Sequence, residues 1–124
     1  MKRLILGIVI ALMVLSFAVG SVALAQEDIT IGMTISGLFS PGFVEMKRQA
    51  ELKAEELGVE LITVSADNDI DRQYEQVKDF ISRQVDCIII NTIDSYGIVK
   101  AVEEANKAGI PVITVDRASF GGEV

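Results

Sequence analysis

Residues 87–91 read CIIIN, and this nearly continuous apolar run decides the fold class. A short, β-branched run with no polar alternation is typical of a parallel strand that is covered on both faces. A second run of the same kind follows at residues 111–115. Between the two, apolar side chains recur at helical spacing over residues 98–107, and Gly109 and Pro111 lie just beyond. These signals end a helix, so the segment predicts a strand-helix-strand unit.

The same alternation extends toward the N-terminus. Residues 29–35 and 60–64 have strand character, and residues 43–57 and 70–81 have one apolar and one polar helical face. The order β-α-β-α-β-α-β with short loops predicts an α/β fold, a three-layer α-β-α sandwich around a parallel sheet, Rossmann-like or flavodoxin-like. In such a sheet, ligands bind at the carboxyl ends of the strands.

The first 25 residues differ from the rest. Lys2 and Arg3 precede an uncharged stretch that ends in Ala23-Leu24-Ala25. This order predicts a secretory signal peptide over residues 1–25, which leaves residues 26–124 as the mature domain. An uncleaved membrane anchor is the alternative, because the uncharged stretch is long enough to span a bilayer. No cysteine for a lipid anchor lies near the cleavage point, so we expect a periplasmic protein without membrane insertion after cleavage.

The other end of the sequence gives a second expectation. After Asp116 and Arg117, residues 118–122 have turn character, and Glu123 and Val124 resemble the start of another strand. We expect a chain that is incomplete and that leaves the edge of the fourth strand unpaired, which is an aggregation hazard.

Composition and motifs argue against several classes of function. The chain has 11 basic and 18 acidic residues and a net charge of −7, which disfavours nucleic acid and anionic lipid as partners. It contains no histidine, and the loop at residues 36–42 has neither a dinucleotide fingerprint nor a phosphate loop. Asp67, Asp69 and Asp71 alternate as calcium ligands do, but helix capping explains them better, because the glycine and the distal glutamate of a calcium loop are missing. We therefore expect no catalytic residue, no metal, no cofactor and no enzymatic activity.

The strand ends carry groups that suit a polyol. Asp116 and Arg117 place an acceptor-only carboxylate beside a five-donor guanidinium after the fourth strand. They could instead pair with each other or cap a loop, and position alone does not decide. Phe39 and Phe43 flank Pro41 and could stack on a sugar ring, although Phe43 also belongs to the apolar face of the first helix.

Four segments resemble the ribose-binding branch of the type I periplasmic binding proteins, in order and at matching spacing. They are the first strand with residues 40–44, and then residues 54–58, 88–95 and 108–117. The resemblance covers residues 29–124 and implies the N-terminal lobe of a two-lobed receptor. In that family, a sugar is clamped between the lobes and delivered to an ABC permease in the inner membrane.

The resemblance also implies a set of ligand-binding residues. Matching positions make Asp116 and Arg117 hydroxyl ligands, Asn91 a polar contact and Phe43 a stacking ring. Ser40 stands where the family usually has asparagine, and Gly42 stands where it usually has an aromatic residue. The shorter donor and the missing ring enlarge the pocket, so a larger sugar or another small polar ligand fits better than ribose. The predicted site is therefore Ser40, Phe43, Asn91, Asp116 and Arg117.

One alternative of the same fold stays open. An exported sensor lobe could report its ligand to a chemoreceptor or a histidine kinase without any transport role. A sugar-responsive repressor is disfavoured, because a signal peptide stands where its DNA-binding domain would be.

Overall fold

The computed structural model describes residues 28–124, so the predicted signal peptide lies outside the described residues. Seven elements follow one another in the predicted order. They are β1 (Thr30–Ile35), α2 (Pro41–Leu57), β2 (Glu60–Ser65), α3 (Ile70–Ser82), β3 (Cys87–Asn91), α4 (Val99–Lys107) and β4 (Val112–Thr114). Within these residues, no helix combines the length and the apolar character that crossing a membrane requires.

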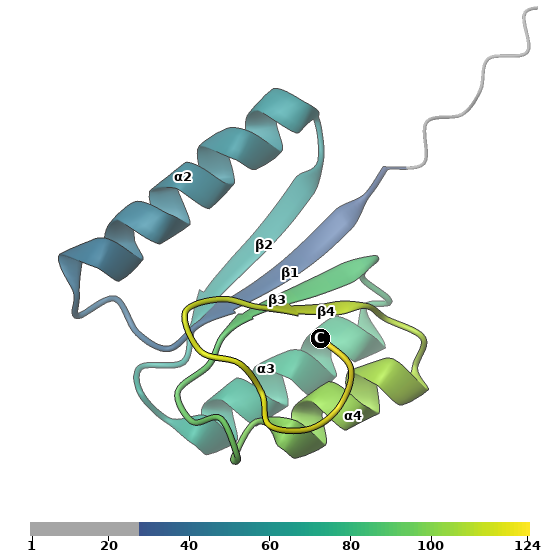
Figure 1. The fold of residues 1–124 in the computed structure, drawn as a ribbon. Helices are drawn as coiled ribbons and strands as arrows, with labels where there is room; N and C mark the ends of the chain where they lie inside the picture. Colours follow the sequence, from purple (N-terminus) through teal and green to yellow (C-terminus); the bar gives the residue numbers. More distant parts are fainter. Residues whose placement is uncertain (1–27) are drawn as a thin grey trace, which may run out of the picture.

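The strands form one parallel sheet in the order β2-β1-β3-β4 (Figure 1). Ile31 of β1 is opposite Leu61 of β2 on one side and Cys87 of β3 on the other, so β1 is an interior strand. Ile88 of β3 is opposite Val112 of β4. The winding reverses at β1, because the first crossover leads to one side of this strand and the second leads to the other. The predicted α/β fold with a parallel sheet is confirmed.

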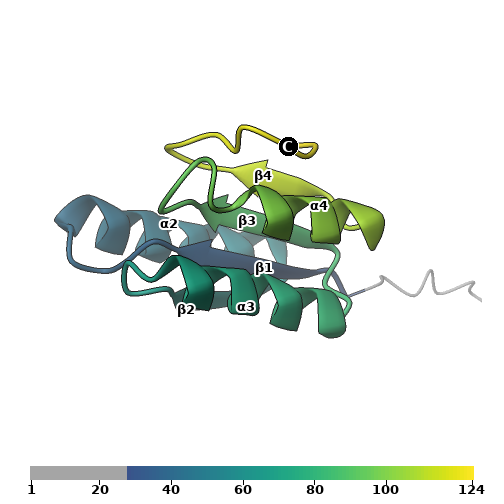
Figure 2. The same ribbon diagram turned by 90° about the horizontal axis from the view of Figure 1, so that it is seen from below.

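Helices cover both faces of the sheet and make the predicted three layers. Helix α2 lies on one face, and α3 and α4 lie side by side on the other (Figure 2). The hydrophobic core lies mainly under α3 and α4, where Phe80, Ile88 and Val102 are almost completely buried. Gly32 of β1 lets α3 approach closely, because a Cβ atom there would lie 2.6 Å from the Phe80 ring.

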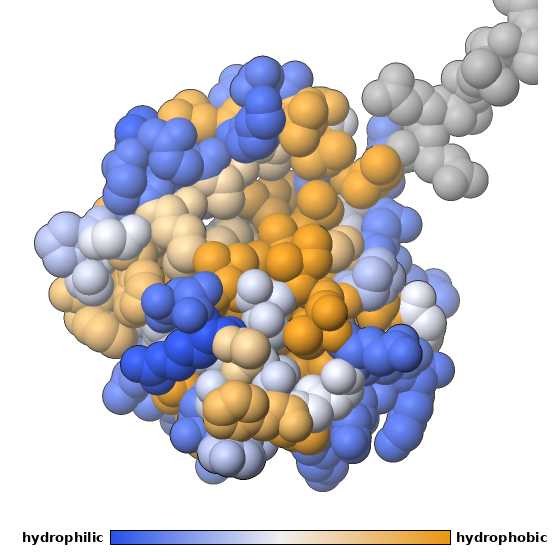
Figure 3. Space-filling model, in the orientation of Figure 1, coloured by the Kyte–Doolittle hydropathy of each residue, from blue (hydrophilic) through white to orange (hydrophobic). Residues whose placement is uncertain are grey.

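The α2 face is covered less completely. Ala54 is the buried residue of α2, whereas Leu57, which the helical pattern places on the same apolar face, is 59% exposed. Ile113 of β4 is 51% exposed, because no helix of residues 28–124 covers this face beside α2. Hydrophobic surface gathers in the middle of this face (Figure 3). An apolar hollow of about 210 Å³ lies under α2, lined by Ile31, Ala50, Lys53, Ala54, Leu57, Val59, Leu61 and Ile89.

Helix ends follow their local sequence. Gly58 ends α2 in the left-handed conformation, with φ 68°, and its N–H bonds back into the last turn. Asp69 begins α3 and accepts hydrogen bonds from the N–H groups of Asp71 and Arg72 at 3.0 and 3.1 Å. Capping is therefore the role of Asp69, as the aspartate pattern indicated.

The segment after β4 corrects one expectation. Glu123 and Val124 do not begin a strand. Instead, the Glu123 N–H donates to Asn106 Oδ1 at 2.8 Å, and Asn106 Nδ2 donates to the Glu123 carbonyl at 3.1 Å. A Cβ atom at Gly122 would lie 2.5 Å from a methyl carbon of Val102, so this segment packs closely on α4. The asparagine side chain satisfies the backbone groups that a neighbouring strand would otherwise bond.

Candidate functional site at the carboxyl edge of the sheet

The carboxyl ends of all four strands meet at one edge of the sheet, as parallel pairing requires. The loops that leave them span residues 36–40, 66–69, 92–98 and 115–120. Four of the five predicted site residues lie in these loops or directly beside them, and Phe43 lies in the first turn of α2. This edge is where a doubly wound sheet binds ligands.

Asn91 ties three strand ends together. Its Oδ1 accepts from the backbone N–H and the hydroxyl of Ser36, at 3.1 and 2.7 Å, after β1. Its Nδ2 donates to the carbonyl of Val115, after β4, at 3.3 Å. The side chain is fully buried, and one amide hydrogen remains for another partner. The main role of Asn91 in this structure is therefore to brace the carboxyl edge by connecting the strand ends.

Gln73 extends this brace and was missed by the sequence-based prediction. Its Nε2 donates to the carbonyl of Asn91 at 2.9 Å, and its Oε1 accepts from the N–H of Ile93 at 3.1 Å. The side chain is completely buried between α3 and the sheet. The available signal was a glutamine between Ile70 and Val77 on the apolar face of a helix, where a polar side chain needs buried partners.

Asp116 and Arg117 do not pair with each other. Arg117 Nη1 donates to the carbonyl of Ile93 at 2.7 Å, which leaves other donors of its guanidinium available. The Asp116 carboxylate has no hydrogen bond or ion pair within residues 28–124. Asp116 is exposed and has φ 72°, a left-handed conformation that is uncommon outside glycine. A strained backbone thus presents an unpaired carboxylate at the edge.

Ser40 and Phe43 lie at the start of α2. Ser40 is the N-cap by backbone geometry, but its side chain makes no capping hydrogen bond. Its hydroxyl therefore stays available. Phe43 is half-buried in the first turn, and its ring stands edge-on to that of Phe39, with centroids 6.0 Å apart. Above Gly42 the space is open, since a Cβ atom there would meet only Ser40 Oγ, at 3.7 Å.

The loop between β2 and α3 contributes a further exposed amide. Asp67 and Asn68 both have positive φ, 52° and 61°. Asp67 forms an ion pair with Arg72 and accepts a hydrogen bond from the Ser65 hydroxyl at 2.7 Å. The Asn68 N–H donates to the carbonyl of Ser36 at 2.6 Å, whereas its exposed side-chain amide has no partner in the described part of the chain. The aspartate pattern did not separate these roles.

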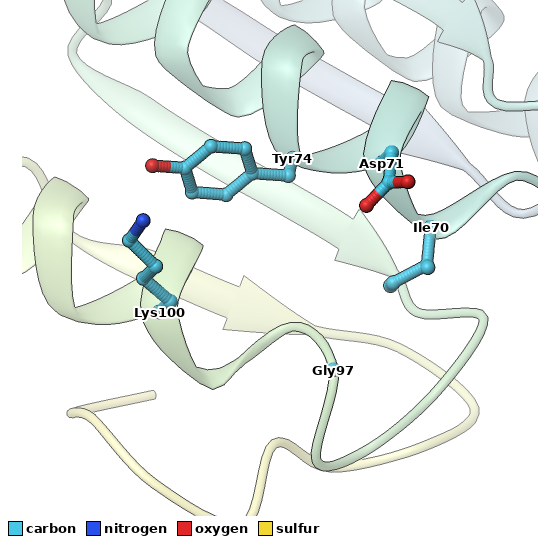
Figure 4. Close-up of a pocket in the computed structure, with 5 residues that line it drawn as sticks. All are labelled: Ile70, Asp71, Tyr74, Gly97 and Lys100. Atoms are coloured by element: carbon cyan, nitrogen blue, oxygen red, sulfur yellow. The ribbon is translucent and has the colours of Figure 1, made fainter.

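A pocket of about 320 Å³ lies elsewhere, between the N-terminal turns of α3 and α4 (Figure 4). It is lined by Ile70, Asp71, Tyr74, Gly97 and Lys100. The Tyr74 hydroxyl donates to Glu104 at 2.7 Å, and Lys100 Nζ lies 4.9 Å from the Tyr74 ring centroid. The interaction of Lys100 with Tyr74 chiefly, and with the Glu104 carboxylate next, raises the pKa of the Lys100 amine. The Tyr74 hydroxyl has its partner in Glu104, and no predicted site residue lines this pocket.

Comparison with known proteins gives one family. The sequence model of the periplasmic binding protein domain matches residues 31–124. The ribose import binding protein of Bacillus subtilis is 41% identical over 99 residues, which are 80% of this chain and 32% of that protein. The ribose import binding protein of Escherichia coli is 36% identical over 124 residues, which are 100% of this chain and 40% of that protein.

A solved structure agrees with this result. An ABC transporter solute binding protein of Mycobacterium smegmatis with bound glycerol superposes with a TM-score of 0.73 and is 34% identical. The superposition covers 77% of this chain and 33% of that chain. The chain thus spans about a third to two fifths of the length of these relatives.

Proposed function

Because the chain belongs to the periplasmic binding protein domain family, we propose that it is the N-terminal lobe of the sugar-binding component of an ABC importer. It binds a sugar or a similar small polyol at the carboxyl edge of its sheet, in the periplasm. An ABC permease in the inner membrane is the partner that receives the ligand. Its role is binding without catalysis.

The observation that carries this proposal is the unpaired Asp116 carboxylate beside Arg117. A carboxylate can accept two hydroxyl hydrogens of a polyol, and the guanidinium can donate to the hydroxyl oxygens. The bond from Arg117 to the carbonyl of Ile93 fixes the position of the guanidinium before a ligand arrives. Preorganised polar groups of this kind reduce the entropy lost on binding.

The other predicted residues contribute to the site in different ways. Ser40 offers a hydroxyl that no helix cap consumes, and the Phe43 ring offers an apolar surface at the same edge. Asn91 holds the edge together from a buried position, so its contribution to binding is to keep the strand ends around the ligand in place. The relatives named for ribose import support a sugar as the ligand class.

Titration of this chain with D-ribose and D-glucose, followed by NMR at the backbone amides of residues 91–95 and 115–118, tests the proposal. We expect at least one sugar to shift these amides. Asp116→Ala should weaken that binding about tenfold, since one charge-assisted bond is lost from an exposed site.

Glu55→Ala is the matched control. Glu55 is an exposed carboxylate on α2, and its removal should leave the sugar affinity unchanged. Equal binding by Asp116→Ala and the parent chain would show that the Asp116-Arg117 pair is structural and that the site is elsewhere.

A further inference from the structure

We propose that Phe39 is a specificity-determining residue of this site, and that it forms with Phe43 an aromatic corner that selects cyclic polyols over open-chain ones. This inference rests on the proposed sugar-binding function. The sequence indicated that Phe39 could stack on a sugar ring, but the predicted site of five residues does not include it.

The position of the Phe39 ring is the first observation. Phe39 lies in the loop between β1 and α2 and is 68% exposed. Its ring plane makes an angle of 81° with that of Phe43, and the ring centroids are 6.0 Å apart. Two nearly perpendicular rings, one exposed and one half-buried, therefore meet beside the carboxyl end of β1.

Gly37 determines how the Phe39 ring lies. A Cβ atom at residue 37 would be 2.2 Å from Cε1 and 2.5 Å from Cδ1 of this ring, so the ring rests directly on the glycine backbone. Gly37 itself is buried. The glycine therefore lets an exposed ring pack on the loop and against Phe43, and the ring does not simply project into solvent.

The strand order places the corner and Asp116 after two strands that are separated by one other strand. β1 and β4 are separated by one strand, β3, so their ends lie about 10 Å apart, which is two interstrand spacings. The corner follows β1, and Asp116 follows β4. A monosaccharide-sized ring between them can contact aromatic rings on one side while its hydroxyls reach the carboxylate on the other.

The chemistry of the corner favours a closed ring. Pyranoses and cyclitols present flat patches of C–H groups, and aromatic faces and edges bind such apolar patches. Two rings at right angles can contact a face and an edge of one rigid ligand. An open-chain polyol has no flat face and loses more conformational freedom on binding, so it gains less from the same corner.

The experiment compares myo-inositol with D-sorbitol, a cyclic and an open-chain polyol with the same number of hydroxyl groups. Each is titrated into the parent chain, Phe39→Leu and Phe39→Tyr, and binding is followed at the backbone amides of residues 115–118. We expect the parent chain to prefer myo-inositol. Phe39→Leu should weaken myo-inositol binding about three- to tenfold with little effect on sorbitol, and Phe39→Tyr should keep the preference.

Phe120→Leu is the matched control. Phe120 is 65% exposed and its ring contacts Tyr96, with centroids 4.7 Å apart, so it is a similarly exposed phenylalanine with a different aromatic partner. Its substitution should leave the preference unchanged. An intact preference in Phe39→Leu, an equal loss in Phe120→Leu, or equal binding of the two polyols by the parent chain would overturn the inference while leaving the sugar-binding function in place. If neither polyol shifts residues 115–118 although D-ribose or D-glucose does, the inference fails and the proposed function stands, and if none of the four ligands shifts them, both fail.

Discussion

At the scale of single residues, Asn91 holds the strand ends at the carboxyl edge in place. Its buried side chain joins the ends of β1, β3 and β4 through contacts with Ser36 and Val115. Asn91→Ala would leave the Ser36 N–H and the Val115 carbonyl without this partner in a buried place. We expect the free energy of unfolding to fall by about 2–4 kcal/mol, measured by urea denaturation.

Asn68→Gly serves as the comparison for Asn91→Ala. It also removes a side-chain amide from the edge, but this amide is exposed, and glycine tolerates the φ of 61°. Its effect on stability should stay within about 0.5 kcal/mol. A similar loss in both variants would mean that Asn91 does not brace the edge.

Two glycines that touch aromatic rings should respond differently to alanine. A Cβ atom at Gly32 would lie 2.6 Å from the Phe80 ring, which is 1% exposed and cannot move away. Gly32→Ala should therefore destabilise the chain by about 1–3 kcal/mol through overpacking. Gly37→Ala meets the exposed Phe39 ring, which can swing into solvent, so its effect on the thermal midpoint should be clearly smaller. The reverse order would contradict this account.

The sequence predicts the roles of some residues and not of others, and the difference has a physical reason. Asp69 was recognisable as a cap because capping depends on a short-range pattern of residue types. Asn91 was noted for its position at a strand end, but its bonds to Ser36 and Val115 depend on how three distant segments meet. Gln73 is missed for the same reason, since its partners lie in β3 and in the loop that follows.

At the scale of elements, the start of α3 offers a clean test of capping. Asp69 Oδ1 accepts two N–H groups of the first turn. Asp69→Ala should lower the free energy of unfolding by about 0.5–2 kcal/mol. Asp71→Ala is the control, because Asp71 lies in the same turn and interacts only with the helix dipole, so its effect should be a few tenths of a kcal/mol. Equal effects in urea denaturation would reject the capping role.

The surface of α2 predicts a small dependence of stability on pH. Arg48 chiefly, and Gln49 next, hold the pKa of Glu45 at about 2, below its usual value of 4.5. A lowered folded pKa stabilises the protein above pH 4.5, and this contribution disappears as pH falls toward 2. Thermal midpoints should therefore fall more between these pH values for the parent chain than for Glu45→Gln. High salt should reduce the difference, since the pair is exposed. Parallel curves at low salt would contradict the assignment.

The elements themselves were predictable because periodicity is a local property. Helix α2 shows the limit of that approach: Leu57 has the spacing of a buried residue, yet it is 59% exposed. How far a helix is covered depends on its neighbours across the sheet. The angle between the Phe39 and Phe43 rings likewise depends on the folded structure, because the spacing of the two residues in the sequence does not specify it.

At the scale of the whole molecule, the uncovered sheet face predicts self-association. Ile113 is 51% exposed on edge strand β4, beside the apolar hollow under α2. Unpaired edges and exposed apolar faces promote contact between copies. The sedimentation coefficient should rise with concentration, and Ile113→Lys should suppress that rise.

Leu52→Lys is the matched control for the edge. Leu52 is 47% exposed on α2, so its substitution adds the same charge without altering β4. Equal suppression by both variants would indicate a general effect of net charge. A monomer at every concentration of the parent chain would contradict the prediction.

The order of the strands determines at which stage of synthesis and folding this sheet can form. Among the strands of residues 28–124, no two neighbours are joined by a hairpin, and Ile31 of the interior strand β1 pairs with Leu61 and Cys87. Every strand pairing must therefore close a long loop before it gains a contact, which makes folding slower than that of a helical bundle of similar size. During synthesis, β1 emerges first but cannot be paired on both sides until residue 91 has emerged. The nascent chain thus does not have both partners of β1 until β3 has been made, and the docking of β3 onto β1 should limit the folding rate.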